Sequence, residues 1–294
     1  MKEGNQKGND KTAEAIISLK RVYENPFSRY LIRYFAKRVK VDKALEVYCG
    51  LRRPKGIREK VGAFVVSLAI NKGAEVFGSK KEDFIDYFKK SVPRRGLSLV
   101  LRSVAEYGVT RPQKLVAPFL VVWDFTRRCN LRCKHCYADA GKPAPDELTT
   151  EQAKEVVEQL DRAGVVAVAL SGGEPTLRDD FLEIVSYIHE RGMYVSVASN
   201  GTLITKRLAR QMKKAGVGYV EISLDHTNPK IHDEFRGVEG AWQRAVEGIK
   251  NCVKAGITTG IATTVTKYNY DDIPKMIELA KRLGVHKFIA FNFV

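Results

Sequence analysis

The spacing of apolar residues changes between Pro112 and Pro118. Ahead of these prolines, apolar residues recur every three or four positions, which is the spacing of one helix face. A clear instance is the set Leu97, Val100, Leu101 and Val104. No segment before residue 115 alternates in the manner of a strand. The pattern predicts an all-helical domain over residues 12–112, preceded by a polar, disordered tail over residues 1–11.

From residue 117 onward, short β-branched runs alternate with amphipathic helical patterns. The predicted strands are residues 119–126, 165–171, 194–199, 219–225, 260–266 and 287–294. The helical patterns between them are residues 149–164, 178–192, 205–216, 240–256 and 271–284. Most of these patterns end in a glycine shortly before the next strand, as helices with a glycine C-cap do. Thr149 and Gln152 predict a capping box at the first helix.

Strand–helix repeats of this kind require parallel strands joined by right-handed crossovers. Six units of about 30 residues favour a partial (β/α)6 TIM-type barrel over residues 117–294, rather than a closed barrel of eight strands. A flat, doubly wound sheet remains the alternative, because periodicity does not distinguish the two. The predicted fold class is therefore α/β, a partial barrel preceded by a small all-helical domain.

The charge of the chain is unevenly distributed. The formal net charge is +16, and residues 1–110 hold 24 Lys and Arg against 12 Asp and Glu, a net charge of +12. Such a surface favours an anionic partner, which can be a nucleic acid, an anionic membrane surface or a substrate rich in carboxylates or phosphates. A solvated basic surface with no partner is the alternative interpretation.

Neither a secretory signal nor a membrane span is evident in the sequence. The first residues are polar and contain no apolar segment of the signal-peptide kind. The longest apolar runs, residues 61–70 and 115–123, are too short to cross a bilayer. We therefore expect a soluble cytoplasmic protein, in which clustered cysteines bind metal or carry out redox chemistry more often than they form disulfides.

Three of the five cysteines lie within eight residues, in the segment FTRRCNLRCKHCYA. They are Cys129, Cys133 and Cys136, spaced C-x3-C-x2-C. A four-iron cluster normally takes one cysteine per iron, so three cysteines leave one iron with an open position for a substrate. A zinc site that uses His135 as its fourth ligand is disfavoured, because His135 abuts Cys136 and cannot easily complete the same tetrahedron.

Polar or glycine-rich segments follow the first four predicted strands, where parallel α/β folds collect their chemistry. The cysteines follow the first strand and Gly172-Gly173-Glu174-Pro175 the second. Ser199-Asn200 follows the third strand, and Ser223 and Asp225 close the fourth. The sequence therefore predicts that these segments form one site at the carboxyl ends of the strands.

With this motif and the SGGEP segment, the sequence resembles the radical S-adenosylmethionine (radical SAM) enzymes, whose signature is C-x3-C-x-φ-C. His135 takes the φ position, where an aromatic residue is usual. The residues of the segments WDFTRRCNLRCKHCYA and SGGEP are most similar to those of the branch of peptide maturases, molybdenum-cofactor enzymes and haem-biosynthesis enzymes. The resemblance covers residues 117–294.

The resemblance implies that Cys129, Cys133 and Cys136 hold a [4Fe–4S] cluster and that S-adenosylmethionine (SAM) chelates the open iron. Reductive cleavage of SAM would then give a 5′-deoxyadenosyl radical that abstracts hydrogen from a peptide or a biosynthetic small molecule. The implied SAM-binding residues are His135, Gly172, Gly173, Glu174, Pro175, Ser199, Asn200, Ser223, Asp225 and Arg236.

Each of these segments also has a simpler interpretation. Glu174 can be a helix N-terminal carboxylate, Ser199-Asn200-Gly201 can be only a turn, and Arg236 can be a solvated surface charge. His226 stands where relatives usually carry a small residue, and a lone histidine is more often structural than functional.

The chain ends in the sixth predicted strand, whereas relatives in this branch usually continue into a C-terminal extension with further cysteines. The resemblance therefore implies a missing part, or a part that another chain supplies. It also implies an electron donor such as ferredoxin or flavodoxin. Two alternatives to the peptide or small-molecule enzyme stay open. One is a radical SAM enzyme that modifies RNA, and the other is a non-catalytic iron–sulfur electron carrier or binding protein.

Overall fold

The computed structural model describes residues 26, 30, 41–77 and 80–292. The tail predicted at residues 1–11 and the first part of the predicted helical domain lie outside the described residues, as do the last two residues of the sixth predicted strand. The chain divides into two compact units. One takes in the chain up to Phe119 together with Ala163–Val166, and the other comprises Leu120–Arg162 and Ala167–Val294.

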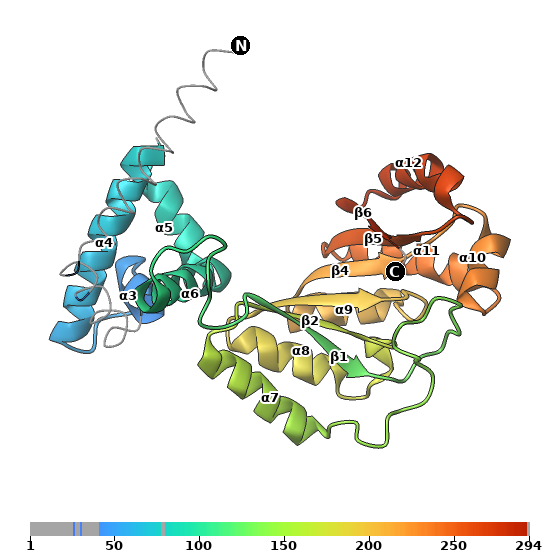
Figure 1. Cartoon of the computed structure of the whole chain (residues 1–294), viewed down its shortest axis with the longest axis horizontal. Coiled ribbons are helices and arrows are strands. Elements are labelled where there is room, and N and C mark those ends of the chain that lie inside the picture. Colours follow the sequence, from blue (N-terminus) through green and yellow to red (C-terminus); the bar gives the residue numbers. More distant parts are fainter. Residues whose placement is uncertain (1–25, 27–29, 31–40, 78–79, 293–294) are drawn as a thin grey trace, which may run out of the picture. The chain divides into compact units, whose positions relative to one another are not determined.

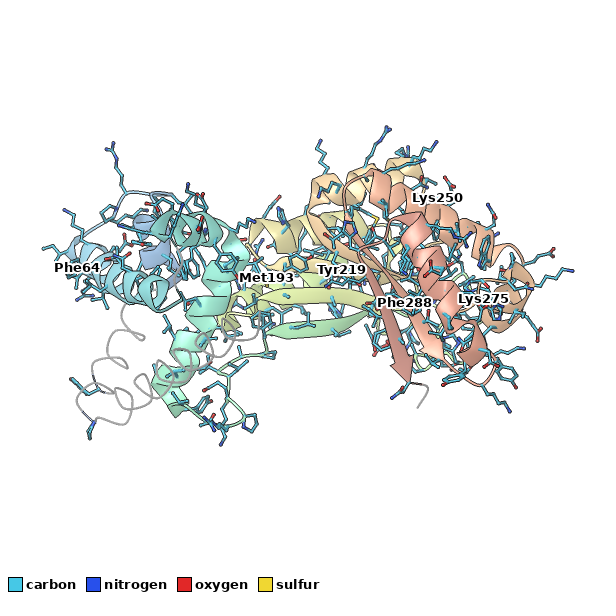
Figure 2. The ribbon with its side chains drawn as sticks, turned by 90° about the horizontal axis from the view of Figure 1, so that it is seen from above. Phe64, Met193, Tyr219, Lys250, Lys275 and Phe288 are labelled. Carbon is cyan, nitrogen blue, oxygen red and sulfur yellow. The ribbon has the colours of Figure 1, made fainter. Side chains whose placement is uncertain are left out.

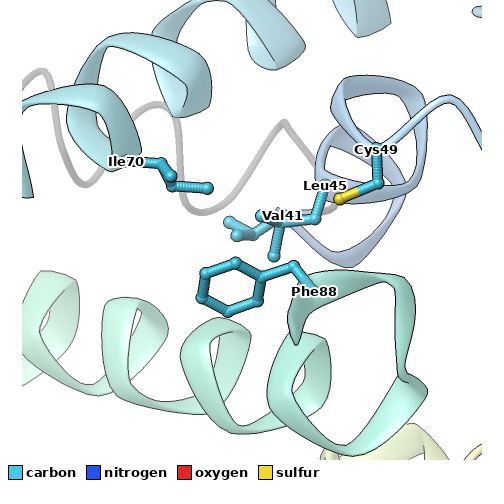
Figure 3. Close-up of a cluster of buried hydrophobic side chains, with 5 residues drawn as sticks. All are labelled: Val41, Leu45, Cys49, Ile70 and Phe88. Carbon is cyan, nitrogen blue, oxygen red and sulfur yellow. The ribbon is translucent and has the colours of Figure 1, made fainter. Parts of the chain in front are cut away.

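The described part of the first unit is helical. Its helices are α3 (Val41–Tyr48), α4 (Ile57–Phe77), α5 (Lys81–Lys89) and α6 (Ser91–Tyr107). A small apolar core joins α3, α4 and α5 (Figure 3). This core consists of Val41, Leu45, Cys49, Ile70 and Phe88. Burial raises the pKa of the Cys49 thiol, so this cysteine behaves as a packed apolar side chain.

The second unit is built on a parallel sheet. Within the described residues the strands are β1 (Leu120–Thr126), β2 (Ala167–Gly172), β3 (Tyr194–Ser199), β4 (Val217–Ser223), β5 (Thr258–Val265) and β6 (Lys287–Asn292). The helices between them are α7 (Thr150–Ala163), α8 (Phe181–Glu190), α9 (Lys206–Ala215), α10 (Pro229–Arg236), α11 (Ala241–Lys254) and α12 (Ile273–Leu283). The capping box predicted at α7 is present, since Thr149 N donates to Gln152 Oε1 at 2.9 Å and Gln152 N donates to Thr149 Oγ1 at 3.3 Å.

The order of the strands separates the two folds that the sequence left open. All neighbouring strands pair in parallel, and they follow one another in chain order from β1 to β6. A doubly wound sheet instead reverses its order at a switch point and carries helices on both faces. Continuous winding in one direction keeps the crossover helices on one side, as in a TIM-type barrel. The predicted (β/α)6 partial barrel is confirmed.

The helices cover one face of this sheet (Figure 1). In β3, Val195 and Val197 are buried while the alternate residues are half-buried, and α8 packs on this strand. Helices α9 and α11 pack on β4, and α12 packs on β6. Figure 2 shows the same division, with Tyr219 in the sheet and Lys250 and Lys275 on the outer helices. The opposite face and the carboxyl ends of the strands therefore remain available for a site.

The predicted strand boundaries need small corrections. Strand β4 begins at Val217, directly after the left-handed C-cap Gly216, and ends at Ser223. Asp225 therefore lies beyond the strand rather than in it.

No helix in the described part of the chain combines the length and the apolarity that crossing a bilayer demands.

Candidate active site at the carboxyl ends of the strands

The cysteine loop follows β1, and each of its three sulfur atoms accepts one N–H group. Leu131 N donates to Cys129 Sγ at 3.5 Å, and Ala140 N donates to Cys136 Sγ at 3.4 Å. The sulfur of Cys133 differs, since it accepts from Arg236 Nη1 at 3.6 Å. Cys129 and Cys133 are half-buried, whereas Cys136 is exposed. Burial raises the pKa of the Cys129 and Cys133 thiols.

The same loop is attached to the end of α10. Arg132 N donates to Arg236 O and Lys134 N donates to Phe235 O, both at 3.0 Å. The His135 ring stacks on the Phe235 ring, with centroids 4.3 Å apart and planes 7° apart. The His135 Nδ1 atom is buried and has no hydrogen-bond partner among the described residues. Burial lowers the pKa of His135, so its ring is neutral at pH 7.

The segment after β2 approaches the end of β1 closely because it contains two glycines. Gly172 has a φ of 106°, a conformation that favours glycine. A Cβ atom on Gly172 would overlap the carbonyl oxygen of Thr126, and one on Gly173 would overlap that of Arg128. The backbones are also hydrogen-bonded, from Gly173 N to Thr126 O at 2.7 Å and from Glu174 N to Arg128 O at 2.8 Å.

Glu174 is completely buried and links the ends of β2 and β3. Its Oε1 accepts from Thr176 Oγ1 at 2.6 Å, from Ser199 Oγ at 2.9 Å and from Thr176 N at 3.2 Å. Its Oε2 accepts from Asn200 N at 2.7 Å. Burial raises the pKa of Glu174 although these bonds oppose the rise. Pro175 is buried behind it and begins a short 3-10 helix, Pro175–Leu177.

Glu174 caps the N-terminus of this short 3-10 helix, as the simpler interpretation allowed, but it is buried and also accepts from Ser199 and Asn200. The bonds to Ser199 and Asn200 also show that this segment does more than turn the chain, since it supplies partners to a buried carboxylate. The structure brings these predicted residues together at one edge of the sheet.

Asp225 and Arg236 form a buried ion pair. Asp225 Oδ2 accepts from Arg236 Nε and from Arg236 Nη2, each at 2.7 Å. Asp225 Oδ1 accepts from Thr264 N at 3.1 Å. Arg236 is 7% exposed, so it is not the solvated surface charge that the sequence allowed. Ser223 is half-buried at the end of β4.

Residues 123–280, more than half of the chain, match the family model described as the Radical SAM superfamily. The chain belongs to the radical SAM superfamily. It is therefore an enzyme, and its cofactors are those of the superfamily, SAM and a [4Fe–4S] cluster. The interpretation as a non-catalytic electron carrier is wrong for the same reason.

Curated radical SAM relatives fall in the branch that the motifs predict. The chain is 39% identical over 176 residues to the Fe-coproporphyrin III synthase of Methanosarcina barkeri, covering 60% of this chain and 44% of that protein. It is 38% identical over 171 residues to the mycofactocin maturase MftC of Mycolicibacterium smegmatis, covering 58% and 43% of the two chains. The match thus spans about half the length of these relatives.

Solved structures share the fold of the radical SAM unit. Streptococcus suis SuiB bound to S-adenosylmethionine gives a TM-score of 0.60 at 18% identity, over 81% of this chain and 53% of that one. The anSMEcpe structure with bound AdoMet gives a TM-score of 0.52 at 21% identity, over 60% and 51% of the two chains. At these identities the likeness concerns the fold.

Sequence reasoning missed two asparagines of the radical SAM unit. Asn130 Oδ1 accepts from Asn200 Nδ2, and Asn130 Nδ2 donates to Thr202 Oγ1, both at 2.8 Å. Asn269 Nδ2 donates to Asp225 O at 3.0 Å and to Thr264 O at 2.9 Å. Asn130 could have been found, because it lies inside the cysteine motif. Asn269 had no comparable signal, since it follows β5 in an ordinary polar turn.

A cavity of about 170 Å³ lies beside the Asp225–Arg236 pair. Its lining includes Asp225, His226, His232, Phe235 and Asn269. His226, which the sequence left unassigned, is 3.1 Å from Asp272 Oδ2 through its Nδ1 atom, and the same atom accepts from Asn228 N at 2.8 Å. His226 thus holds the loop that follows β4, which favours the structural interpretation of this histidine.

Proposed function

We propose that Cys129, Cys133 and Cys136 hold the [4Fe–4S] cluster of this enzyme and that SAM binds between the cysteine loop and the ends of β2–β4. The observation that carries the proposal is the ring of donors around the three thiols. Each sulfur accepts an N–H group, and such bonds stabilise thiolates that bind iron. When bound, the two cofactors supply the one-electron cleavage of SAM that starts hydrogen abstraction from the substrate.

The ends of β2 and β3 suit the amino-acid part of SAM. Because Gly172 and Gly173 have no side chain, the segment after β2 packs directly on the end of β1 and is fixed beside the cysteine loop, where the amino-acid part of SAM would bind. Glu174 supplies a buried negative charge for the methionine ammonium, and Pro175 fixes the turn behind it. Ser199 and Asn200 would lie toward the ribose.

The ends of β4 and α10 suit the methionine carboxylate. We assign Ser223 and Arg236 to it, and Arg236 offers its Nη1 side, because Asp225 occupies Nε and Nη2. The main role of Asp225 is therefore to orient Arg236 through this ion pair, and a contact with the ribose is secondary. His135 presents a neutral ring with an unpartnered Nδ1 atom, which suits contact with adenine.

The substrate class that the relatives support is a peptide or a biosynthetic small molecule. Relatives named as a haem-pathway synthase and as a maturase match the chain with nearly equal identity, and SuiB has been solved with its precursor peptide SuiA. A low-potential electron donor such as ferredoxin or flavodoxin completes the reaction. We place the protein in the cytoplasm.

Anaerobic reconstitution tests this proposal. The chain is supplied with iron and sulfide, reduced with dithionite in the presence of SAM, and assayed for 5′-deoxyadenosine. We expect cluster assembly and SAM cleavage by the parent chain and by the control Cys252→Ala, which removes a thiol buried in α11. Neither should occur when Cys129, Cys133 and Cys136 are all changed to Ala. A parent chain without a cluster, or a triple variant that still cleaves SAM, would contradict the proposal.

The basic excess in residues 1–110 favours a second candidate, in which the substrate is RNA. Phosphate contacts from Lys and Arg give binding that weakens steeply with salt. Binding of a labelled RNA that is lost between 50 and 200 mM salt would support this candidate, whereas salt-insensitive or absent binding would leave the peptide or small molecule.

A further inference from the structure

One of the three thiol-bearing residues has a donor of a different kind from the other two. The sulfur atoms of Cys129 and Cys136 accept neutral backbone N–H groups. The sulfur of Cys133 accepts from the guanidinium of Arg236 at 3.6 Å, a normal distance for a sulfur acceptor. Among the described contacts of the three cysteines, only this sulfur therefore accepts from a charged donor, whose Nη1 atom is nearer to the sulfur than to the Asp225 carboxylate that pairs with Nε and Nη2.

Arg236 is held so that it cannot easily turn away from Cys133. Asp225 Oδ2 accepts from both Nε and Nη2 of Arg236 at 2.7 Å. Asp225 is itself held in place because its Oδ1 atom accepts from Thr264 N at 3.1 Å. The backbone carbonyl of Arg236 accepts from Arg132 N at 3.0 Å. Arg236 is therefore bonded to the cysteine loop through its backbone as well as through its side chain. Asp225 is 2% exposed and Arg236 is 7% exposed, so water and salt screen the guanidinium little.

We propose that Arg236, positioned by Asp225, raises the reduction potential of the [4Fe–4S] cluster through its bond to Cys133 Sγ. This inference rests on the proposed function, since it requires the cluster on these cysteines. Reduction adds one electron, supplied by a low-potential one-electron donor, and one negative charge to the cluster. A cation and an N–H donor at a ligating sulfur stabilise the more negative state. The cluster thereby becomes easier to reduce.

The contact with Cys133 is distinct from the role of Arg236 toward the methionine carboxylate. The bond joins Arg236 to Cys133 Sγ and involves no atom of SAM, so its effect should appear in the potential of a cluster measured without SAM. A residue that acted only on the carboxylate would leave the potential of the SAM-free cluster unchanged. This difference makes the inference separable from SAM binding.

The test is a redox titration of the reconstituted chain without SAM, followed by the electron paramagnetic resonance signal of the reduced cluster. The variants are Arg236→Gln, Arg236→Lys and the control Arg132→Gln. Arg132 precedes Cys133 and carries the same charge, but its side chain is exposed and approaches Gly141. Iron and sulfide contents are measured to show that each variant holds an intact cluster.

We expect Arg236→Gln to lower the potential so that the ratio of reduced to oxidised cluster falls about tenfold at a fixed potential, a shift of about 59 mV. Arg236→Lys should lie between the parent and Arg236→Gln, because it keeps the charge and loses the fork. Arg132→Gln should shift the potential much less, because water screens its charge.

A shift for Arg236→Gln no larger than that of Arg132→Gln would overturn the inference and leave the proposed function intact. If Arg236→Gln fails to hold a cluster, Arg236→Lys decides in the same way. A parent chain that assembles no cluster would refute both the inference and the proposed function.

Discussion

Replacement of Glu174 by Gln tests how the buried carboxylate holds the site together. Gln has the same shape, but one of its two terminal atoms is a donor. With the amide oxygen at the Oε1 position, the NH2 group of Gln takes the place of Glu174 Oε2, which accepts from Asn200 N at 2.7 Å in the parent chain. With the opposite orientation, the NH2 group faces Thr176 N, which donates to Oε1 at 3.2 Å. Either way one backbone N–H group loses its acceptor, the buried one of Asn200 or the partly buried one of Thr176.

A buried donor left without a partner costs about 1–3 kcal/mol, so we expect Glu174→Gln to lower the free energy of unfolding by that amount. Hydroxyls do not add to this cost, because those of Thr176 and Ser199 can rotate. Glu174→Ala should cost more, since it leaves both backbone N–H groups and a cavity. The number of backbone N–H groups left without an acceptor thus predicts the order of stability, with the parent most stable, Glu174→Gln next and Glu174→Ala least stable.

Urea unfolding followed by tryptophan fluorescence measures this effect in the radical SAM unit alone. Both tryptophans of the chain, Trp123 and Trp242, lie in that unit. The control is Glu247→Gln, an exposed position on α11, which should leave the unfolding curve nearly unchanged. The reasoning is refuted if Glu174→Gln unfolds at the same urea concentration as Glu247→Gln.

Three further predictions follow, one from a close backbone contact and two from the burial of a titratable side chain. Gly173→Ala should destabilise the unit by about 1–3 kcal/mol in urea unfolding, because its Cβ would overlap the carbonyl oxygen of Arg128; an unchanged curve would contradict this. Burial lowers the pKa of His232 to about 4, so from pH 7 to pH 5 the unfolded chain takes up a proton that the folded chain does not. The parent should therefore lose about 2 kcal/mol more than His232→Gln over that range, and equal losses would argue against it. Burial raises the pKa of Cys252 to about 12, so at pH 8 the apo chain should react with iodoacetamide at exposed Cys136 and not at Cys252, as peptide mapping would show.

The local patterns of the sequence were sufficient for most of the radical SAM unit. Strand β3 has the predicted bounds, residues 194–199, β6 begins at the predicted residue, and β1, β2, β4 and β5 shift by one or two residues at their ends. The Thr149–Gln152 capping box forms as predicted. Such features depend on neighbours within one or two turns of chain, which is why a single sequence reveals them. The cysteine motif likewise needs only its own spacing to be recognised.

The partners of the site residues could not be predicted in the same way. Arg236 and Cys133 are 103 positions apart, and Asn200 and Asn130 are 70 positions apart. The resemblance implied that Asp225 and Arg236 both bind SAM, and only the structure shows that the two side chains pair with each other. A side chain chooses its partner by its position in space, and spacing along the chain carries no information about it.

The sequence by itself determined that six strands alternate with helical segments and that polar segments follow the first four strands. Only the tertiary structure decided the order of the strands, because right-handed crossovers wind equally well in one direction or in two. Winding from β1 to β6 in one direction brings the four polar segments to one edge. The same step places the Arg236 guanidinium against Cys133, a contact set by packing over the whole unit rather than by any local pattern.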